Sequence, residues 1–289
     1  MRLFVFGHGY SAAAIVRRLR DRLDWVGATT RSSEKAERLR ADGIEPFLFD
    51  GTAPGEGIRD ALQAATHVLV SIAPGAVGDP VLKRHGADLS IGRRPRALVY
   101  LSTVGVYGDH AGAWVDERTP VKPVSDRSVA RVDAEGRWLR YAEMAQVPVA
   151  ILRLSGIYGP GRNALVNLAE GTSKRLVKPG QVFNRIHAED IAEATARCFR
   201  RGADGVFNVT DDEPAAPQDV VAYAASLMGV DPPPEQAFDD AVLTTMARSF
   251  YGENKRVSNG KSRRELGMTY AYPNYRIALE RMWREETWR

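Results

Sequence analysis

Cysteine and closely spaced histidines are scarce in this chain. A single cysteine among 289 residues cannot form a disulfide framework or a thiolate zinc site. The five histidines, at positions 8, 67, 85, 110 and 187, never pair at the spacing of metal ligands. We therefore expect no metal site, and a reducing compartment.

Long hydrophobic runs are also missing. No apolar segment approaches the roughly 20 residues that a membrane-spanning helix needs. The first nine residues, MRLFVFGHG, hold an uninterrupted run of four apolar residues before two glycines, which is too short for a signal peptide and fits a first strand. We predict a cytoplasmic protein that does not contact a membrane.

A large excess of charge of one sign is absent as well. The 40 basic residues, 33 Arg and 7 Lys, face 36 acidic residues and leave a net charge of +4. Acidic residues are interleaved with the scattered arginines, as in RSSEKAERLRADG at 31–43, so we expect no nucleic-acid partner. Hydrophobic residues make up 44% of the chain, which is ample for a core and excludes a disordered chain.

Short apolar runs alternate with helical patterns through the first two thirds of the chain. The expected strands are 2–6, 25–30, 44–49, 67–72, 97–102, 149–154 and 205–209. The expected helices are 10–23, 32–42, 56–64, 126–146 and 188–200. Nearly continuous apolar strands that alternate with helices indicate a parallel sheet covered on both faces. The fold class is therefore α/β, with a doubly wound, mostly parallel Rossmann-type sheet.

Prolines interrupt the pattern after about residue 160. We predict a dinucleotide-binding Rossmann domain at 1–165 that also takes 184–212. The segments 166–183 and 213–289 are expected to form a small, mostly helical substrate lobe at the carboxyl edge of the sheet. Its expected helices are 217–228, 239–247, 261–266 and 274–286.

A glycine motif lies directly between the first strand and the first helix. In this GxGxxA pattern Gly7 allows a tight turn, Gly9 lets the backbone approach a pyrophosphate, and Ala12 lets the helix pack on the sheet. The helix N-terminus would then present N–H groups and partial positive charge to the phosphates. The alternative is a glycine turn without a ligand. The predicted phosphate loop comprises Gly7, His8, Gly9, Tyr10, Ser11 and Ala12.

The end of the second strand favours NADP over NAD. An acidic residue at this point would bind the adenosine 2′-hydroxyl and repel a phosphate, but the strand ends in Thr-Thr-Arg-Ser-Ser. Arg31 can pair with a 2′-phosphate, and Ser32 can add a contact. Asp50, at the end of the third strand, is expected near the adenine amino group. Arg31 as a solvated side chain and Asp50 as a turn residue remain the alternatives.

Five segments in order carry a family likeness over nearly the whole chain. LVYLSTVGVYGD (98–109) and LRLSGIYGPGRN (152–163) resemble strand motifs of the extended short-chain dehydrogenase/reductases, the nucleotide-sugar epimerases and dehydratases. RIHAEDIAEA (185–194), FNVTDDEP (207–214) and SNGKSRRELGM (258–268) resemble their later segments. The resemblance implies a Rossmann fold, a nicotinamide dinucleotide and a small-molecule substrate. Family members often dimerise through the long helix, so a homodimer is left open.

The same resemblance exposes a departure at the catalytic helix. In that family a strand Ser or Thr and a Tyr-x-x-x-Lys pair carry out the chemistry. The alignment places the hydroxyl residue at Thr103, the lysine position at Arg131 and the tyrosine position at Arg127. Arginine stays protonated and cannot act as a general acid or base. The chain thus resembles atypical members that keep the cofactor site without the usual tyrosine.

Other residues are expected to take over the role of the missing tyrosine or to line the cofactor and substrate site. Arg131 is expected to hold the ribose, Thr103 to contact substrate or nicotinamide, and Tyr107 is a candidate proton donor whose alternative is a structural role. Loops after two further strands are expected along the cofactor: Ser71, Ile72, Ala73, Ser155 and Gly156. Basic and polar candidates for the substrate are Arg162, Asn163, Arg185 and Lys255, each with a surface role as the alternative.

Two functions remain open from the sequence. One is an NADP-binding oxidoreductase-like enzyme acting on a carbonyl, alcohol or sugar-type substrate. The other is a non-catalytic sensor of the dinucleotide that regulates a partner. An open polar cavity beside the nicotinamide position would favour the enzyme, and a filled one the sensor.

Overall fold

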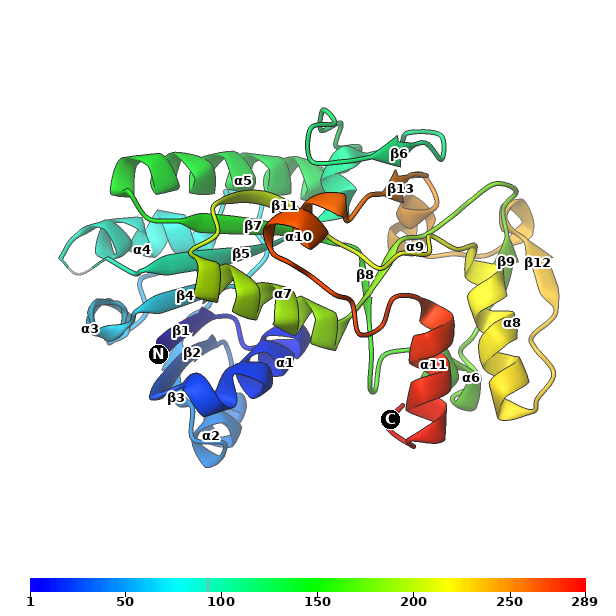
Figure 1. Cartoon of the computed structure of the whole chain (residues 1–289), viewed down its shortest axis with the longest axis horizontal. Helices are drawn as coiled ribbons and strands as arrows, with labels where there is room; N and C mark the ends of the chain where they lie inside the picture. The colour runs from blue at the N-terminus through cyan, green and yellow to red at the C-terminus, as the bar shows by residue number, and fades with distance from the viewer. Residues whose placement is uncertain (93) are drawn as a thin grey trace.

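The sheet has parallel strands in the order β11-β7-β5-β4-β1-β2-β3 (Figure 1). The computed structural model describes residues 1–92 and 94–289, with the side chains of 245–247 outside that description. The strands are β1 (Arg2–Phe6), β2 (Trp25–Thr30), β3 (Glu45–Leu48), β4 (His67–Val70), β5 (Ala97–Thr103), β7 (Val149–Leu154) and β11 (Gly205–Val209). The predicted fold class is confirmed.

Helices cover both faces of this sheet because both faces are apolar. In β1, Leu3 and Val5 enter one core, while Phe4 and Phe6 enter the other. The first core is covered by α1 (Tyr10–Leu19), α2 (Ser33–Ala41) and α7 (Ala188–Arg201). The second is covered by α3 (Ile58–Ala64), α4 (Pro80–Ser90) and α5 (Asp126–Ala145). The helix α4 was not among the expected elements.

A smaller lobe lies beyond the carboxyl ends of the central strands, at the right of Figure 1. Its helices are α6 (Ala164–Ala169), α8 (Pro217–Met228), α9 (Thr245–Phe250) and α11 (Tyr275–Arg284). Short parallel pairs join β8 (Gly156–Tyr158) to β10 (Arg185–His187), β9 (Arg175–Val177) to β12 (Glu235–Ala237), and β6 (Trp114–Val115) to β13 (Arg256–Val257). Single-turn helices are η1 (Arg20–Arg22), η2 (Val104–Tyr107) and η3 (Phe238–Asp240).

Three expectations about elements need correction. The helix expected at 10–23 ends at Leu19 and continues as η1, and the one expected at 239–247 is replaced by η3 and α9. The segment 213–289 is not wholly part of the small lobe. It returns to the sheet at α10 (Gly260–Glu265), and Leu266 and Met268 pack in the core beneath α1 and α7.

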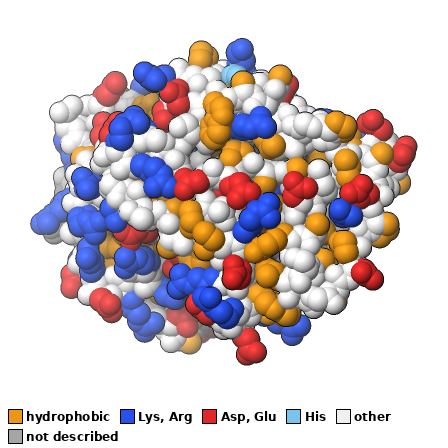
Figure 2. Space-filling view, turned by 45° about the vertical axis from the view of Figure 1, so that its right-hand side comes forward, with side chains coloured by type: hydrophobic (Ala, Val, Ile, Leu, Met, Phe, Trp, Pro, Cys, Tyr) orange, Lys and Arg blue, Asp and Glu red, His pale blue; other side chains and the backbone are white. Residues whose placement is uncertain are grey.

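Charged side chains of both signs lie on the surface of the molecule (Figure 2). Figure 2 shows acidic side chains among the numerous Lys and Arg side chains on the face that it displays. None of the helices in the described part of the chain is long and apolar enough to cross a membrane.

Candidate functional site

The glycine loop has the geometry that its sequence predicts. Gly7 has φ +88°, and a Cβ there would lie 2.8 Å from Ile72 Cγ1, so other residues would be strained. Its N–H donates to Thr29 Oγ1 at 2.8 Å. At Gly9 a Cβ would meet no heavy atom of the described residues within 4 Å. Ala12 is fully buried against the sheet.

The N-terminus of α1 forms the other half of this loop. Gly9 is its N-cap residue and brings no side chain to cap the helix, so no N-cap side chain satisfies the first backbone N–H groups of α1. Such a helix end binds phosphate oxygens. The residues present therefore fit the pyrophosphate of a dinucleotide.

Flanking side chains brace the loop. Lys35 Nζ contacts the carbonyl oxygen of His8, and this lysine was not predicted. Burial and the charge of Lys35 lower the pKa of His8. Tyr10 Oη donates to the carbonyl of Pro160 at 2.9 Å, which joins the loop to the segment after β8. Ser11 is buried within α1.

The adenosine end carries its predicted residues at the ends of β2 and β3. Arg31 is exposed, and Ser32 Oγ caps α2 by accepting from the N–H of Lys35 at 3.2 Å. Asp50 accepts from the N–H and hydroxyl of Thr52 at 2.8 and 2.7 Å, and these bonds lower its pKa. Asp50 therefore forms the turn that was its alternative, while its adenine contact stays a prediction.

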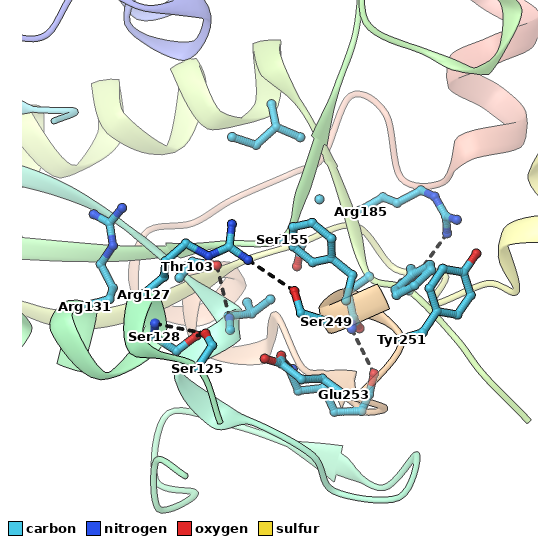
Figure 3. Close-up of a pocket in the computed structure, with 18 of the residues that line it drawn as sticks. Thr103, Ser125, Arg127, Ser128, Arg131, Ser155, Arg185, Ser249, Tyr251 and Glu253 are labelled. Carbon is cyan, nitrogen blue, oxygen red and sulfur yellow. Dashed lines mark hydrogen bonds and ion pairs between the residues drawn. The ribbon is translucent and has the colours of Figure 1, made fainter. Parts of the chain in front are cut away.

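A cavity of about 830 Å³ lies beside the ends of β4, β5 and β7, beneath the small lobe (Figure 3). Predicted residues that line it are Ala73, Thr103, Arg127, Arg131, Ser155, Gly156, Arg162, Arg185 and Lys255. Residues that were missed include Ser125, Ser128, Ser249, Phe250, Tyr251 and Glu253. Ser71 and Ile72 lie outside the described lining, with Ile72 against the glycine loop.

Arg131 is held against β5 rather than left mobile. Its Nη1 donates to Tyr100 Oη and to the carbonyl of Leu101, each at 2.9 Å. Burial raises the pKa of Tyr100. Tyr100, the strand tyrosine that contacts Arg131, was not predicted from the sequence. The helix tyrosine, Tyr141, points elsewhere and donates to the carbonyl of Leu89.

Arg127 extends from α5 toward the small lobe (Figure 3). Its Nη2 donates to Ser249 Oγ at 3.3 Å, and its guanidinium lies 5.5 Å from the ring centre of Phe250. The position aligned with the family's tyrosine thus carries a cation that links the two lobes across the cavity.

Two site predictions are corrected by the structure. Tyr107 is fully buried, and its hydroxyl donates to Asn208 Oδ1 at 2.9 Å, so it does not line the cavity. Burial also raises its pKa. Asn163 caps α6 and faces a separate cavity of about 330 Å³ in the small lobe. Neither residue is placed to contact a substrate in the main cavity.

A lysine and a glutamate form an ion pair on the cavity wall. Lys255 Nζ lies 2.6 Å from Glu253 Oε2 and donates to the carbonyl of Gly108 at 2.8 Å. Thr103 Oγ1 accepts from the N–H of Gly105 at 3.1 Å. Among the described residues, no cluster of three or more His, Cys, Asp or Glu side chains could hold a metal.

A buried histidine near the site gives a pH-dependent prediction. His187 Nδ1 caps α7, its ring stacks on Tyr272 with centres 3.7 Å apart, and burial lowers its pKa to about 4. As the pH falls below 6.5, His187 binds a proton in the unfolded chain but not yet in the folded one. The free energy of unfolding therefore falls as the pH falls toward 4. Compared with His187→Asn, the wild type should lose about 2–3 kcal/mol more free energy of unfolding between pH 7 and 4.

Urea denaturation of both proteins across that range measures the difference. The comparison between variants is needed because burial raises the pKa of Asp190 to about 6, which acts in the opposite direction. Parallel pH profiles for the two proteins would contradict the prediction.

Comparisons with known proteins agree with this architecture. A solved structure of a functionally unknown conserved protein from Silicibacter pomeroyi is 46% identical, with 99% of both chains covered and a TM-score of 0.89. Protein YeeZ of Escherichia coli is 25% identical over 282 residues, covering 93% of this chain and 96% of YeeZ. The dTDP-glucose 4,6-dehydratase of Bacillus anthracis, solved with NAD, is 18% identical, with 99% and 97% covered and a TM-score of 0.76.

A family model decides the assignment. The model described as the NAD-dependent epimerase/dehydratase family matches residues 3–210, from the first strand to the end of β11. This confirms the family resemblance that the strand motifs indicated. The chain belongs to the NAD-dependent epimerase/dehydratase family.

Proposed function

We propose that this protein is an NADP-dependent oxidoreductase that acts on a carbonyl or alcohol carbon of a small molecule. The observation that carries the proposal is the open cavity of about 830 Å³ beneath the small lobe, which is lined by Thr103, Arg131 and the Glu253–Lys255 pair. An open cavity favours an enzyme over the non-catalytic sensor. The cytoplasmic location and a homodimer through α5 stay predictions.

The residues divide into binding and proton-exchanging groups. The loop at Gly7 and Gly9 and the end of α1 would hold the pyrophosphate, and Arg131 would face the nicotinamide ribose. The bound nicotinamide supplies a carbon that gives or accepts hydride. Thr103, which lines the same cavity, would orient a substrate oxygen. Because Arg127 cannot exchange a proton, we assign that role to the Glu253–Lys255 pair, which lines the same cavity.

Turnover and structure together test this proposal. NADPH oxidation is followed by nicotinamide absorbance with a panel of aldehydes, ketones and oxo acids, and a crystal structure with NADP places the dinucleotide. We expect turnover with one class of carbonyl and the nicotinamide beside Thr103. Tight NADP binding with no turnover, in a crystal whose cavity is closed by side chains, would favour the sensor.

The choice of NADP rests on Arg31 at the end of β2. Replacing Arg31 with alanine removes a charge-assisted contact to the 2′-phosphate, worth about 1.5–3 kcal/mol. NADP affinity should fall about tenfold or more, and NAD affinity should hardly change. Calorimetric titration of both dinucleotides measures this.

Arg38→Ala is the matched control for Arg31. Arg38 is an exposed arginine in α2, and its Nη2 lies 3.5 Å from Glu34 Oε1. Its loss should leave both affinities unchanged. Equal wild-type affinities for NADP and NAD would contradict the choice of cofactor.

A further inference from the structure

The cavity concentrates positive charge. Its ionisable cations are Arg127, Arg131, Arg162, Arg185 and Lys255, and Glu253 is the one carboxylate in the described lining. The resulting excess of four positive charges equals the formal net charge of the whole chain. A cleft with this imbalance attracts anions.

Most of these cations have partners that account for them. Lys255 pairs with Glu253 at 2.6 Å. The half-buried Arg185 donates to two backbone carbonyls, and Asp211 acts on it electrostatically. Arg131 is anchored by the Tyr100 hydroxyl and a carbonyl of β5.

Two of these cations, Arg127 and Arg162, are exposed and have only uncharged described partners. Arg162 lies 5.9 Å from the ring centre of Tyr10 at the glycine loop, whereas Arg127 extends toward the small lobe (Figure 3). It is exposed at the cavity, and its described partners are uncharged: the Ser249 hydroxyl at a long 3.3 Å and the ring of Phe250. It lies in the first turn of α5, where the helix dipole adds positive potential. A ligand with two terminal oxygens could replace the Ser249 contact by the two parallel bonds that a guanidinium favours.

The dinucleotide itself does not account for this charge. Its pyrophosphate is expected at the glycine loop, and residues 7–12 are not among the described residues that line the cavity. An oxyanion that matched Arg127 would therefore belong to a second molecule in the cleft.

We propose that Arg127 determines substrate specificity by binding an anionic group, a carboxylate or a phosphate, on the molecule that reacts. This inference rests on the proposed function, because it places that molecule beside the nicotinamide. The substrate class is then a small oxo or hydroxy compound that carries the anion close to its reacting carbon. Binding would transfer Arg127 from Ser249 to the substrate.

Titration of small anions tests the assignment. The NADP-saturated protein is titrated with malonate, inorganic phosphate and, as an uncharged probe, malonamide, at an ionic strength held constant with chloride. We expect one or both anions to bind and malonamide not to bind. Tighter binding of malonate would identify a carboxylate, and tighter binding of phosphate a phosphate group.

Variants connect that binding to Arg127. Arg127→Gln should weaken the preferred anion by roughly tenfold or more while NADP affinity stays constant. Arg140→Gln, which removes an exposed arginine from the same helix, should behave as the wild type. Ser249→Ala should keep or raise the anion affinity, because it leaves Arg127 in place.

Two results would overturn the proposal. One is equal anion affinity in the wild type and Arg127→Gln. The other is a loss in Ser249→Ala as large as that in Arg127→Gln, which would assign the effect to the contact between the lobes. If NADP itself fails to bind, the proposed function fails, while the same titrations on the cofactor-free protein still test Arg127.

Discussion

Replacing Gly9 with valine will abolish dinucleotide binding and leave the fold intact. The backbone at Gly9 has φ −96°, which valine can adopt, and a Cβ there points into open space, so the substitution creates no internal clash. That same space is the expected path of the pyrophosphate. Losing two charge-assisted contacts to backbone N–H groups should lower affinity about 100-fold or more.

Thermal shift with saturating NADP and NAD measures this effect. The unliganded variant should unfold near the wild-type temperature, and neither dinucleotide should stabilise it. Gly86→Val in α4 is the matched control, since the nearest described atom to a Cβ there is Leu82 Cδ2 at 3.9 Å. Full stabilisation of Gly9→Val by either dinucleotide would show that the motif has been misinterpreted.

Removing Glu135 will destabilise the protein more than any surface change on the same helix. Its carboxylate is buried and binds Arg153 Nη2 at 2.7 Å and Nε at 3.2 Å, and it also accepts from Ser102. Glu135→Ala leaves the buried guanidinium of Arg153 without its counter-charge, which should cost about 3–5 kcal/mol. This is a large share of the roughly 5–15 kcal/mol that keeps a domain folded.

Urea denaturation compares this variant with two controls. Asp133→Ala breaks an exposed pair in the same helix, where Arg137 Nε lies 2.7 Å from Asp133 Oδ2, and should cost at most about 1 kcal/mol. Joint replacement of Glu135 and Arg153 by leucine should recover much of the lost stability, because no unpaired charge remains. Similar costs for Glu135→Ala and Asp133→Ala would contradict the argument.

Contiguous features of this protein were predictable from the sequence. The glycine loop needs a positive φ at Gly7 and free space at Gly9, and glycine at these two positions meets both needs. The sheet strands follow from apolar runs that bury both faces. The departure at Arg127 and Arg131 was also visible, because the resemblance places the family's Tyr-x-x-x-Lys pair at these two positions, which lie one turn apart on the same helix face.

The buried position of Tyr107 could not be predicted from the sequence. Strand alternation holds as far as Thr103, after which the chain enters η2, with a three-residue period instead of two. This turn rotates Tyr107 into the core, where Asn208 Oδ1 accepts a hydrogen bond from its hydroxyl. Tyr100, on the strand itself, meets Arg131 instead.

The sequence by itself determined the α/β fold and the glycine loop, because each depends on neighbouring residues, and the family resemblance added the loss of the tyrosine–lysine pair. Only the tertiary structure decided which residues surround Arg127 and Arg131, which stand in place of that pair. Ser249 and Glu253 come from a distant segment, and the packing of the small lobe brings them to the cavity that α5 and β5 border. Their positions depend on long-range packing rather than local pattern, so no spacing in the sequence could have predicted them.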